Sequence, residues 1–315
     1  MKIISNFPAL KEYPQIPVNI SLLSAAKILR RFDRIIINID QALLFKFCFV
    51  KLCLPFLPGE IISIDLLLRT PKKTFVVQAK FLLSKILWKK ISLFILYFKN
   101  TNGYQKLLGI DPKKIRYAPF KVNSWEKIKD KNKNHTEKTY VLCAGRTMRD
   151  LATFSKAMEM NPSIPAIVLL QSNEVMKSHG TNTGAISWPK NITIKEHSDG
   201  LESTFLATIE KASLLIIPRF KQDIASTGIS TMLCAMGLKT PVIISSGPGT
   251  EDILPKGAAE IVAPEDPVAL ASAITSLWTN TEGREQLSTT AYQYASLLEG
   301  DARLLRDILK EVQSL

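Results

Sequence analysis

Hydroxyl side chains and a glycine lie together where an apolar run gives way to a helical pattern. Ser226, Thr227 and Gly228 follow a strand-like run that ends at Pro218, which has no N–H to donate, and a helix is expected to begin near Ser230. Hydroxyl groups and free N–H groups at the positive end of a helix dipole bind anions. The segment therefore predicts a phosphate-binding turn. The alternative is that Ser226 and Gly228 only cap a core helix.

Apolar runs alternate with helical patterns along the chain. This alternation is typical of βαβ units and predicts an α/β fold. In the first half we expect strands and intervening helices at 2–5, 18–31, 34–39, 41–54, 60–66, 74–90 and 92–98. A second series of strands and helices is expected at 139–143, 148–160, 166–170, 192–195, 201–212, 214–217, 230–237, 241–245 and 259–262. The tail from Pro267 is predicted to be helical, with breaks near Asn280 and Gly300.

The chain has 315 residues, which exceeds the usual size of a single core and predicts two domains. The segment EKIKDKNKNHTEK at 126–138 is charged and nearly free of apolar residues, so it is expected to be a linker. The predicted division is an N-terminal domain at 1–125 and a C-terminal domain at 139–315.

Charge is distributed unevenly between these parts. Residues 1–138 contain 26 Lys and Arg against 9 Asp and Glu, a net charge of +17, and the remainder has 15 against 19, a net charge of −4. The basic half is the part expected to meet a polyanion or an anionic membrane. Lysines beside apolar residues predict a basic amphipathic surface within 80–90, or else a helix that packs on a sheet with its lysines in water.

Two apolar segments, 42–57 and 75–98, are interrupted by lysines and are not expected to span a membrane. The N-terminus does not resemble a secretory signal. The four cysteines are scattered without a C-x-x-C pair, which indicates buried thiols in a reducing compartment. A cytoplasmic protein is therefore expected, with peripheral association at the cytosolic membrane face as a further option.

Several separate pieces resemble one enzyme family. They are Gly145-Arg146 after a strand, the Ser-Thr-Gly turn at 226–228, AMGLKTPVI at 235–243 and EDILPKGAAEIVAPEDPVALASAI at 251–274. In order and spacing they resemble the donor-binding domain of GT-B glycosyltransferases, most closely the retaining enzymes of glycosyltransferase family 4. The likeness extends from about Tyr104 to Ala295. Residues 1–100 resemble the family only in the alternation of predicted strands and helices.

The resemblance implies two Rossmann-like domains with a cleft between them, and transfer of a sugar from a nucleotide-sugar to a glycan or lipid-linked acceptor. Retention of the anomeric configuration is implied as well. No cofactor or metal is expected, since arginines and a helix dipole can offset the diphosphate charge, and no D-x-D motif occurs in the chain.

The same resemblance assigns site residues. Arg146 and Arg149 would hold the diphosphate, and guanidinium groups suit this because they bind phosphate oxygens bidentately. Arg149 and Asp150 could instead form a surface pair at a helix start. The remaining donor-binding candidates are Gly145, Ser226, Thr227, Gly228 and Ser230, with Glu251 or Asp252 for the sugar hydroxyls and His197 near the base. The two carboxylates could alternatively serve only to stabilise a helix N-terminus, and a lone exposed histidine usually has no special role.

The sequence departs from the family at one pair of positions. The family pattern has glutamates where this chain has Ser226 and Cys234. A thiol does not accept hydrogen bonds as a carboxylate does, so the contact to the ribose hydroxyls is left unassigned. Ser226 could still bond a sugar hydroxyl or phosphate.

On the acceptor side, ISIDLLLRTPKK at 62–73 ends a strand in Asp65 and continues to Arg69. Asp65 is a candidate base for the acceptor hydroxyl, and Arg69 is a candidate acceptor-binding residue. Asp65 could alternatively cap the following turn. The three histidines, His135, His179 and His197, all lie outside the predicted N-terminal domain, which excludes a histidine base there.

Three other classes of protein are alternatives. The basic pI of about 9.5 would suit a nucleic-acid-binding protein, but no DNA or RNA module is recognisable and nucleic acid is not an expected partner. A non-catalytic GT-B-like protein that binds a nucleotide-sugar remains an alternative because of Ser226 and Cys234. A sugar-nucleotide epimerase is disfavoured because its acid and base residues cannot be identified.

Overall fold

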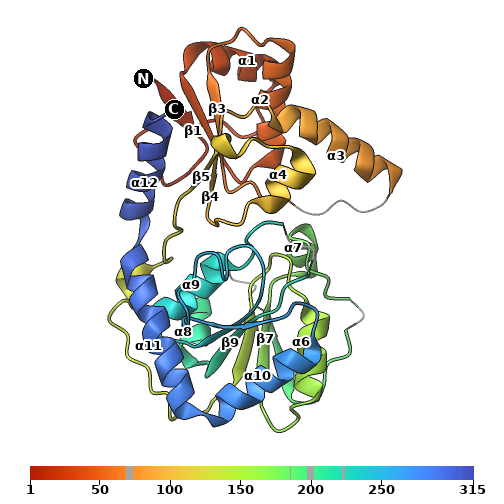
Figure 1. Ribbon diagram of the computed structural model, residues 1–315, viewed down its shortest axis with the longest axis vertical. Helices are drawn as coiled ribbons and strands as arrows, with labels where there is room; N and C mark the ends of the chain where they lie inside the picture. The colour runs from red at the N-terminus through yellow and green to blue at the C-terminus, as the bar shows by residue number, and fades with distance from the viewer. Residues whose placement is uncertain (69–73, 185, 197–201, 222–223) are drawn as a thin grey trace. The chain divides into compact units, whose positions relative to one another are not determined.

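The computed structural model describes residues 1–315 except 69–73, 185, 197–201 and 222–223. The chain forms two compact units, the first from Met1–Pro119 with Asp301–Leu315 and the second from Phe120–Gly300. Each unit is a parallel β-sheet with helices packed on it (Figure 1). The predicted α/β class with two Rossmann-like domains is confirmed.

The first unit contains a five-stranded parallel sheet in the order β1-β2-β3-β4-β5. Its strands are apolar runs rich in isoleucine and leucine, which suits a sheet covered on both faces. Each strand pairs with the next one along the chain, so the strand order does not reverse. The bounds are β1 Ile3–Ser5, β2 Arg34–Asn38, β3 Glu60–Ile64, β4 Leu93–Leu96 and β5 Ile115–Tyr117.

Four helices connect these strands. Right-handed crossovers between successive parallel strands place such helices on one face of the sheet. The helices are α1 Leu22–Arg31, α2 Gln41–Cys53, α3 Phe75–Trp88 and α4 Asn102–Leu108, with a 3₁₀ turn at Pro112–Lys114. Ser21 and Asp40 cap α1 and α2 by accepting from the backbone N–H groups of Ser24 and Leu43. Neither α4 nor β5 was predicted as a separate element.

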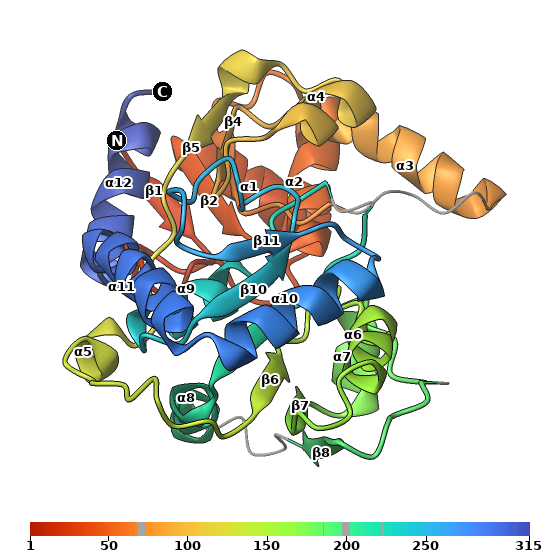
Figure 2. The same cartoon turned by 60° about the horizontal axis from the view of Figure 1, so that its bottom comes forward.

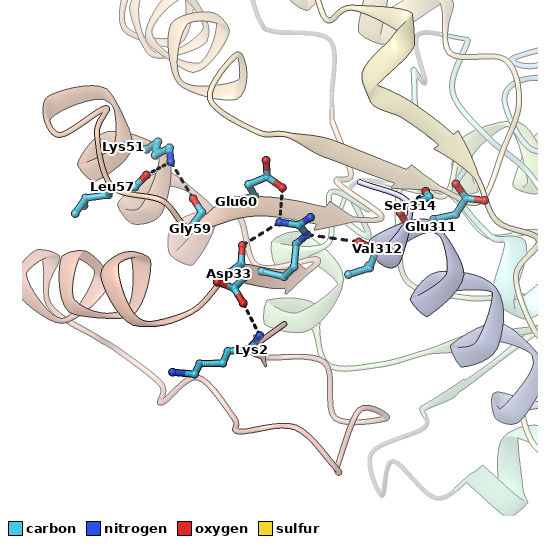
Figure 3. Close-up of polar contacts among 10 residues, drawn as sticks. Lys2, Asp33, Lys51, Leu57, Gly59, Glu60, Glu311, Val312 and Ser314 are labelled. Atoms are coloured by element: carbon cyan, nitrogen blue, oxygen red, sulfur yellow. Dashed lines mark hydrogen bonds and ion pairs between the residues drawn. The ribbon is translucent and has the colours of Figure 1, made fainter.

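The last helix, α12 at Asp301–Gln313, belongs to the first unit and packs against β4 on the face opposite α2 and α3 (Figure 1). It buries Leu304, Ile308 and Val312. Polar contacts secure it, because the Arg34 side chain bonds both the Glu60 carboxylate, at 2.6 Å, and the Val312 carbonyl, at 3.5 Å (Figure 3). Without this helix the second face of the sheet would lack part of its apolar cover.

The second unit contains a six-stranded parallel sheet in the order β11-β10-β9-β6-β7-β8. Helices α6 and α10 share a core with one face, and α10 runs beside β10 and β11 (Figure 2). Helix α9 packs against β9 and β10 and is covered by α8 and α11. The strands are β6 Val141–Ala144, β7 Ala166–Leu170, β8 Ile192–Glu196, β9 Leu214–Ile217, β10 Val242–Ser245 and β11 Glu260–Val262. The helices are α5 Trp125–Ile128, α6 Leu151–Glu159, α7 Asn173–Ser178, α8 Glu202–Lys211, α9 Ile229–Gly237, α10 Pro267–Thr279 and α11 Thr281–Leu298.

The units divide at positions that differ from the predicted boundaries. The chain crosses from the first unit to the second at Pro119 and Phe120 and returns after Gly300. The segment expected to be a linker, 126–138, lies within the second unit, where Ile128 is buried against Gly237 of α9. The Tyr292 hydroxyl and the Arg284 guanidinium also donate to the Lys129 and His135 carbonyls, so this mostly polar segment is anchored at several points. The predicted helical tail is correct, with α10, α11 and α12 separated at Asn280 and Gly300.

Candidate functional site

Strand order reverses in the second sheet between β6 and β9, which lie side by side although the chain visits β7 and β8 between them. Parallel α/β sheets bind ligands outside the carboxyl ends of their strands at such a reversal. Gly145 follows β6, and Arg219 follows β9 after Pro218. The backbones of Arg149 and Arg219 are joined by an isolated antiparallel bridge, so the two loops are held together.

Arg149 is folded back beneath the loop that follows β6. Its side chain is only 2% exposed, with Nε donating to the Ala144 carbonyl at 3.1 Å and Nη1 donating to the Thr147 carbonyl at 2.7 Å. Its backbone N–H donates to Thr181 Oγ1. The bidentate phosphate contact expected of Arg149 does not match this conformation, since two of its donor groups are directed at backbone carbonyls.

The Arg149 guanidinium also lies against the N-terminus of α9. Gly228, the N-cap of this helix, has a φ of +89°, and a Cβ placed on it would lie 2.9 Å from Arg149 Nη2. A Cβ at Gly145, whose φ is +101°, would collide with the same guanidinium. Glycine is required at both positions by backbone conformation and by space. A buried cation and the positive end of a helix dipole are thereby brought to one place, and both favour an anion.

Arg146, the other predicted arginine, is exposed. Its guanidinium lies 3.5 Å from Gln171 Oε1 in the loop after β7, and its carbonyl accepts from Thr181 Oγ1. It therefore lies at the surface of the loop that Arg149 supports from beneath. The two arginines, which the resemblance assigns together to the diphosphate, thus lie on different sides of this loop.

Arg219 is a buried basic residue at this edge that the sequence reasoning missed. Its side chain is 1% exposed, and Nη2 donates to the Pro248 carbonyl at 3.1 Å. A Cβ at Gly247 would lie 2.8 Å from the same nitrogen. Its backbone N–H donates to Ser245 Oγ at the end of β10. The sequence offered one indication of this residue, since Arg219 follows the predicted strand at 214–217 by two positions.

The two glycine-containing loops meet at Ser226. A Cβ at Gly249 would overlap the Ser226 side chain, so the loop after β10 lies directly on it. Ser226 is 4% exposed, and among the described residues its Oγ has no hydrogen-bond partner. Thr227 is buried beside it, and Ser230 accepts a 2.6 Å hydrogen bond from Asn123 Nδ2. Asn123 is a second residue that sequence reasoning did not assign.

The carboxylates at 251–252 are directed at their own loop. Asp252 Oδ1 accepts from the backbone N–H groups of Gly249 at 2.7 Å and Thr250 at 3.0 Å. The Glu251 carboxylate accepts from the Thr250 hydroxyl. Asp252 therefore stabilises the turn that bears Gly249, and not a helix N-terminus as the alternative had it, since residues 246–259 form no helix. Glu251 is exposed and remains a candidate for a ligand contact.

Cys234 occupies the position at which the family has a glutamate. It lies in α9, is 2% exposed, and burial raises the pKa of its thiol to about 12. A neutral buried thiol cannot replace a carboxylate as an acceptor. Among the described residues, no group of three or more His, Cys, Asp or Glu side chains is placed to hold a metal ion.

Asp65 marks a separate candidate site in the first unit. It follows β3 with a φ of +49°, an uncommon conformation for a residue other than glycine, and its N–H donates to the Ile95 carbonyl. Burial raises the pKa of its carboxyl to about 7. The buried Tyr97 and Tyr104 lie close enough for the Asp65 charge to raise their pKa values further. Asp65 can thus exchange a proton near neutral pH, which a general base requires.

A cavity of about 210 Å³ also lies in the first unit, beside the carboxyl ends of β1 and β2. Its polar lining comes from Asn6, Gln15, Asn19, Asp40 and Lys46. Lys46 Nζ donates to the Ile20 carbonyl, and Asn6 exchanges hydrogen bonds with the Asn38 backbone. The cavity is the size of a small polar ligand.

The predicted residues Arg69 and His197 lie outside the described residues, so the structure places neither of them.

Comparison with known proteins identifies the fold. No family model and no curated protein matches the sequence. Among solved structures, HepE of Anabaena in complex with UDP-glucose is 13% identical with a TM-score of 0.71, over 99% of this chain and 92% of that one. A glycosyltransferase from Rickettsia africae is 12% identical with a TM-score of 0.70, over 99% and 89% of the two chains. Sucrose-phosphate synthase from Thermosynechococcus elongatus is 15% identical with a TM-score of 0.63, over 95% and 80%. The chain has the GT-B fold.

Proposed function

We propose that the protein is a glycosyltransferase that transfers a hexose from a nucleotide-sugar to a glycan or a lipid-linked acceptor. The observation that carries this proposal is the placement of Arg149 against Gly145 and Gly228 at the N-terminus of α9. A buried guanidinium beneath glycine loops creates a positive site in which backbone N–H groups can approach a diphosphate closely. The GT-B fold is consistent with this chemistry.

The proposed mechanism stabilises the leaving nucleoside diphosphate. Negative charge builds on the β-phosphate as the glycosidic bond breaks, and fixed positive groups lower the energy of that transition state. The α9 dipole and Arg149 supply positive charge from beneath the loops, and Arg146 supplies positive charge from the exposed side. No metal ion takes part in this mechanism, since these groups offset the charge of the diphosphate.

Ser226 is proposed to contact the donor. Its Oγ lies between the two glycine-containing loops and has no partner among the described residues, so a phosphate or sugar oxygen could satisfy it. The resemblance to glycosyltransferase family 4 supports the proposal that the anomeric configuration is retained, with the leaving phosphate removing the acceptor proton on the same face of the sugar. Product analysis by NMR tests this, because an inverted product would exclude that mechanism.

The first unit is proposed to bind the acceptor. Asp65, with its raised pKa, would orient or partly deprotonate the acceptor hydroxyl. A lipid-linked acceptor in polysaccharide synthesis would place the enzyme in the cytoplasm at the inner face of a membrane. Nucleic acid has no part in this proposal.

The test is a thermal-shift screen. UDP and UDP-glucose are the first probes, because the HepE structures hold these ligands. A ligand at a hundredfold excess over its Kd stabilises the folded state by about 2.7 kcal/mol, which raises Tm measurably. We expect nucleoside diphosphates to raise Tm and uridine to have no effect. If no nucleoside diphosphate or nucleotide-sugar raises Tm, the proposal fails.

A second candidate is a non-catalytic protein that binds a nucleotide-sugar. The buried thiol of Cys234, in place of a carboxylate that would hold the ribose, favours it. Slow hydrolysis of a bound nucleotide-sugar distinguishes the two. Release of free sugar that depends on Arg146 supports the proposal of a glycosyltransferase. Tight binding without any release supports the proposal of a non-catalytic binding protein.

A further inference from the structure

The helical layer of the first unit carries charge of one sign. Helices α1, α2 and α3 contain seven Lys and Arg and no Asp or Glu. No acidic residue occurs in the sequence between Asp65 and Asp111. Acidic neighbours on these helices therefore cannot neutralise the lysines. A layer of this kind attracts an anionic surface over a distance of about one Debye length, ~8 to 10 Å.

Helix α3 leaves an apolar stripe exposed. Phe75, Ala79, Leu82, Leu83 and Ile86 follow the spacing that places side chains on one face of a helix. Phe75 is 87% exposed and Leu82 is 62% exposed. Leu87 and Trp88 at the C-terminal end of the helix are buried, and its N-terminal end extends beyond α2 and α4 (Figures 1 and 2). The stripe is therefore not part of the core of its own unit.

The adjacent helix adds aromatic side chains. Phe45 and Phe49 lie one turn apart on the outer face of α2 with stacked rings, whose centroids are 6.4 Å apart, and Phe56 follows the helix with 77% of its surface exposed. Helix α2 packs beside α3. We use the name α2–α3 surface for the exposed apolar side chains of both helices, together with Phe56 after α2, the exposed Lys80 and the partly exposed Lys85. The apolar members are Phe45, Phe49, Phe56, Phe75, Leu82, Leu83 and Ile86.

We propose that the α2–α3 surface docks on an anionic lipid bilayer. The phenylalanine, leucine and isoleucine side chains enter the boundary between headgroups and acyl chains, and the lysines lie among anionic headgroups. Charge complementarity favours a bilayer over a second copy of this chain, because a two-fold dimer would bring two basic surfaces together. This inference extends beyond sugar transfer and does not depend on the donor site.

The experiment is vesicle flotation of the full chain without nucleotide, at low salt. Vesicles of phosphatidylglycerol mixed with phosphatidylcholine are compared with vesicles of phosphatidylcholine alone. We expect the protein to float with the anionic vesicles only. Replacing both Lys80→Gln and Lys85→Gln should weaken partitioning by about twenty-fivefold, at roughly fivefold for each lysine. Replacing both Leu82→Ser and Ile86→Ser should weaken it by at least about tenfold.

Matched controls lie on the second unit. Leu297→Ser removes an apolar side chain that is 75% exposed on α11, and the pair Lys156→Gln and Lys177→Gln removes two exposed lysines from α6 and α7. These variants should float as the unchanged protein does. All of the altered side chains are exposed or partly exposed, so circular dichroism should show folded protein throughout.

Three outcomes would overturn the inference. The first is that the protein floats with neither kind of vesicle. The second is that flotation survives the Leu82→Ser and Ile86→Ser change, because apolar insertion would then be absent. The third is that sedimentation without lipid shows a dimer that this same change dissociates, because a second copy would then cover the surface.

Discussion

The guanidinium of Arg149 lies directly beneath Gly228, so closely that a Cβ on this glycine would lie 2.9 Å from Arg149 Nη2. Through this contact the loop after β6 packs against the first turn of α9. It also leaves no room for a side chain at Gly228, because the Ile217 side chain and the Arg149 guanidinium fill the space that a Cβ would need.

Gly228→Ala is expected to destabilise the protein and to weaken nucleotide binding. The alanine would have to adopt a φ of +89° and push against the guanidinium, at a cost of about 2 to 4 kcal/mol. Gly257→Ala is the matched control, since Gly257 has a φ of +81° with no heavy atom within 4 Å of its added Cβ. It should cost only about 1 to 2 kcal/mol and leave UDP affinity unchanged. Equal effects of the two substitutions, in urea denaturation and in titration, would contradict the account.

Arg219→Met is expected to reduce affinity for nucleoside diphosphates by about tenfold to a hundredfold, because the loop that bears Gly247 loses its support. Isothermal titration with UDP measures this. Arg284→Met is the control, since Arg284 is also fully buried and donates to the Leu277 and Trp278 carbonyls in the same unit. That variant should lower Tm without altering the Kd for UDP. Unchanged affinity in Arg219→Met would remove Arg219 from the site.

Asp65 is expected to make stability depend on pH. Burial raises its pKa from 3.8 to about 7, so the folded state binds a proton that the unfolded state has released. This contribution to stability is complete below pH 3.8 and is lost as pH rises to about 7. Asp65→Asn should therefore gain stability relative to the unchanged protein over this range, by as much as about 4 kcal/mol. Urea denaturation at pH 5 and pH 8 measures the difference.

The control for this prediction is Asp111→Asn, which replaces an exposed carboxylate in the same unit. Its stability difference from the unchanged protein should be the same at both pH values. A difference for Asp65→Asn that is equally independent of pH would show that Asp65 is ionised normally, and its assignment as a base would lose support.

Ile308→Ala is expected to destabilise the first unit by about 2 to 5 kcal/mol, because Ile308 is fully buried where α12 covers the sheet. Hydrogen exchange should show faster exchange in β4 while β6 and β9 stay protected. Leu297→Ala, at an exposed position of α11, should change neither unit. Faster exchange in β6 and β9 rather than in β4 would contradict the assignment of α12 to the first unit.

Local patterns predicted most of the strands and helices, because apolar runs and helical spacing depend on neighbouring residues. The unit to which α12 belongs could not be predicted in this way. The contact of its Val312 carbonyl with Arg34 joins residues 278 positions apart in the sequence, so local sequence patterns cannot predict it. The linker prediction was wrong for a similar reason, since contacts between residues distant in sequence anchor the segment, among them Ile128 against Gly237 and the Tyr292 hydroxyl on the Lys129 carbonyl.

The candidate site was predicted in part. Arg149 and the turn at 226–228 are brought together as expected, because both follow strands that are neighbours in the sheet. The burial of Arg149 beneath that turn could not be inferred, since it depends on where Gly145 and Gly228 leave space. Arg219 was missed because its partners, Gly247 and Pro248, lie in another loop.

A crystal structure of the protein with UDP tests the central claim most directly. The account predicts the β-phosphate within hydrogen-bonding distance of the backbone N–H groups at the start of α9, above the Arg149 guanidinium and beside Ser226. A diphosphate bound elsewhere, with the loops at 145–149 and 226–230 unoccupied, would contradict it.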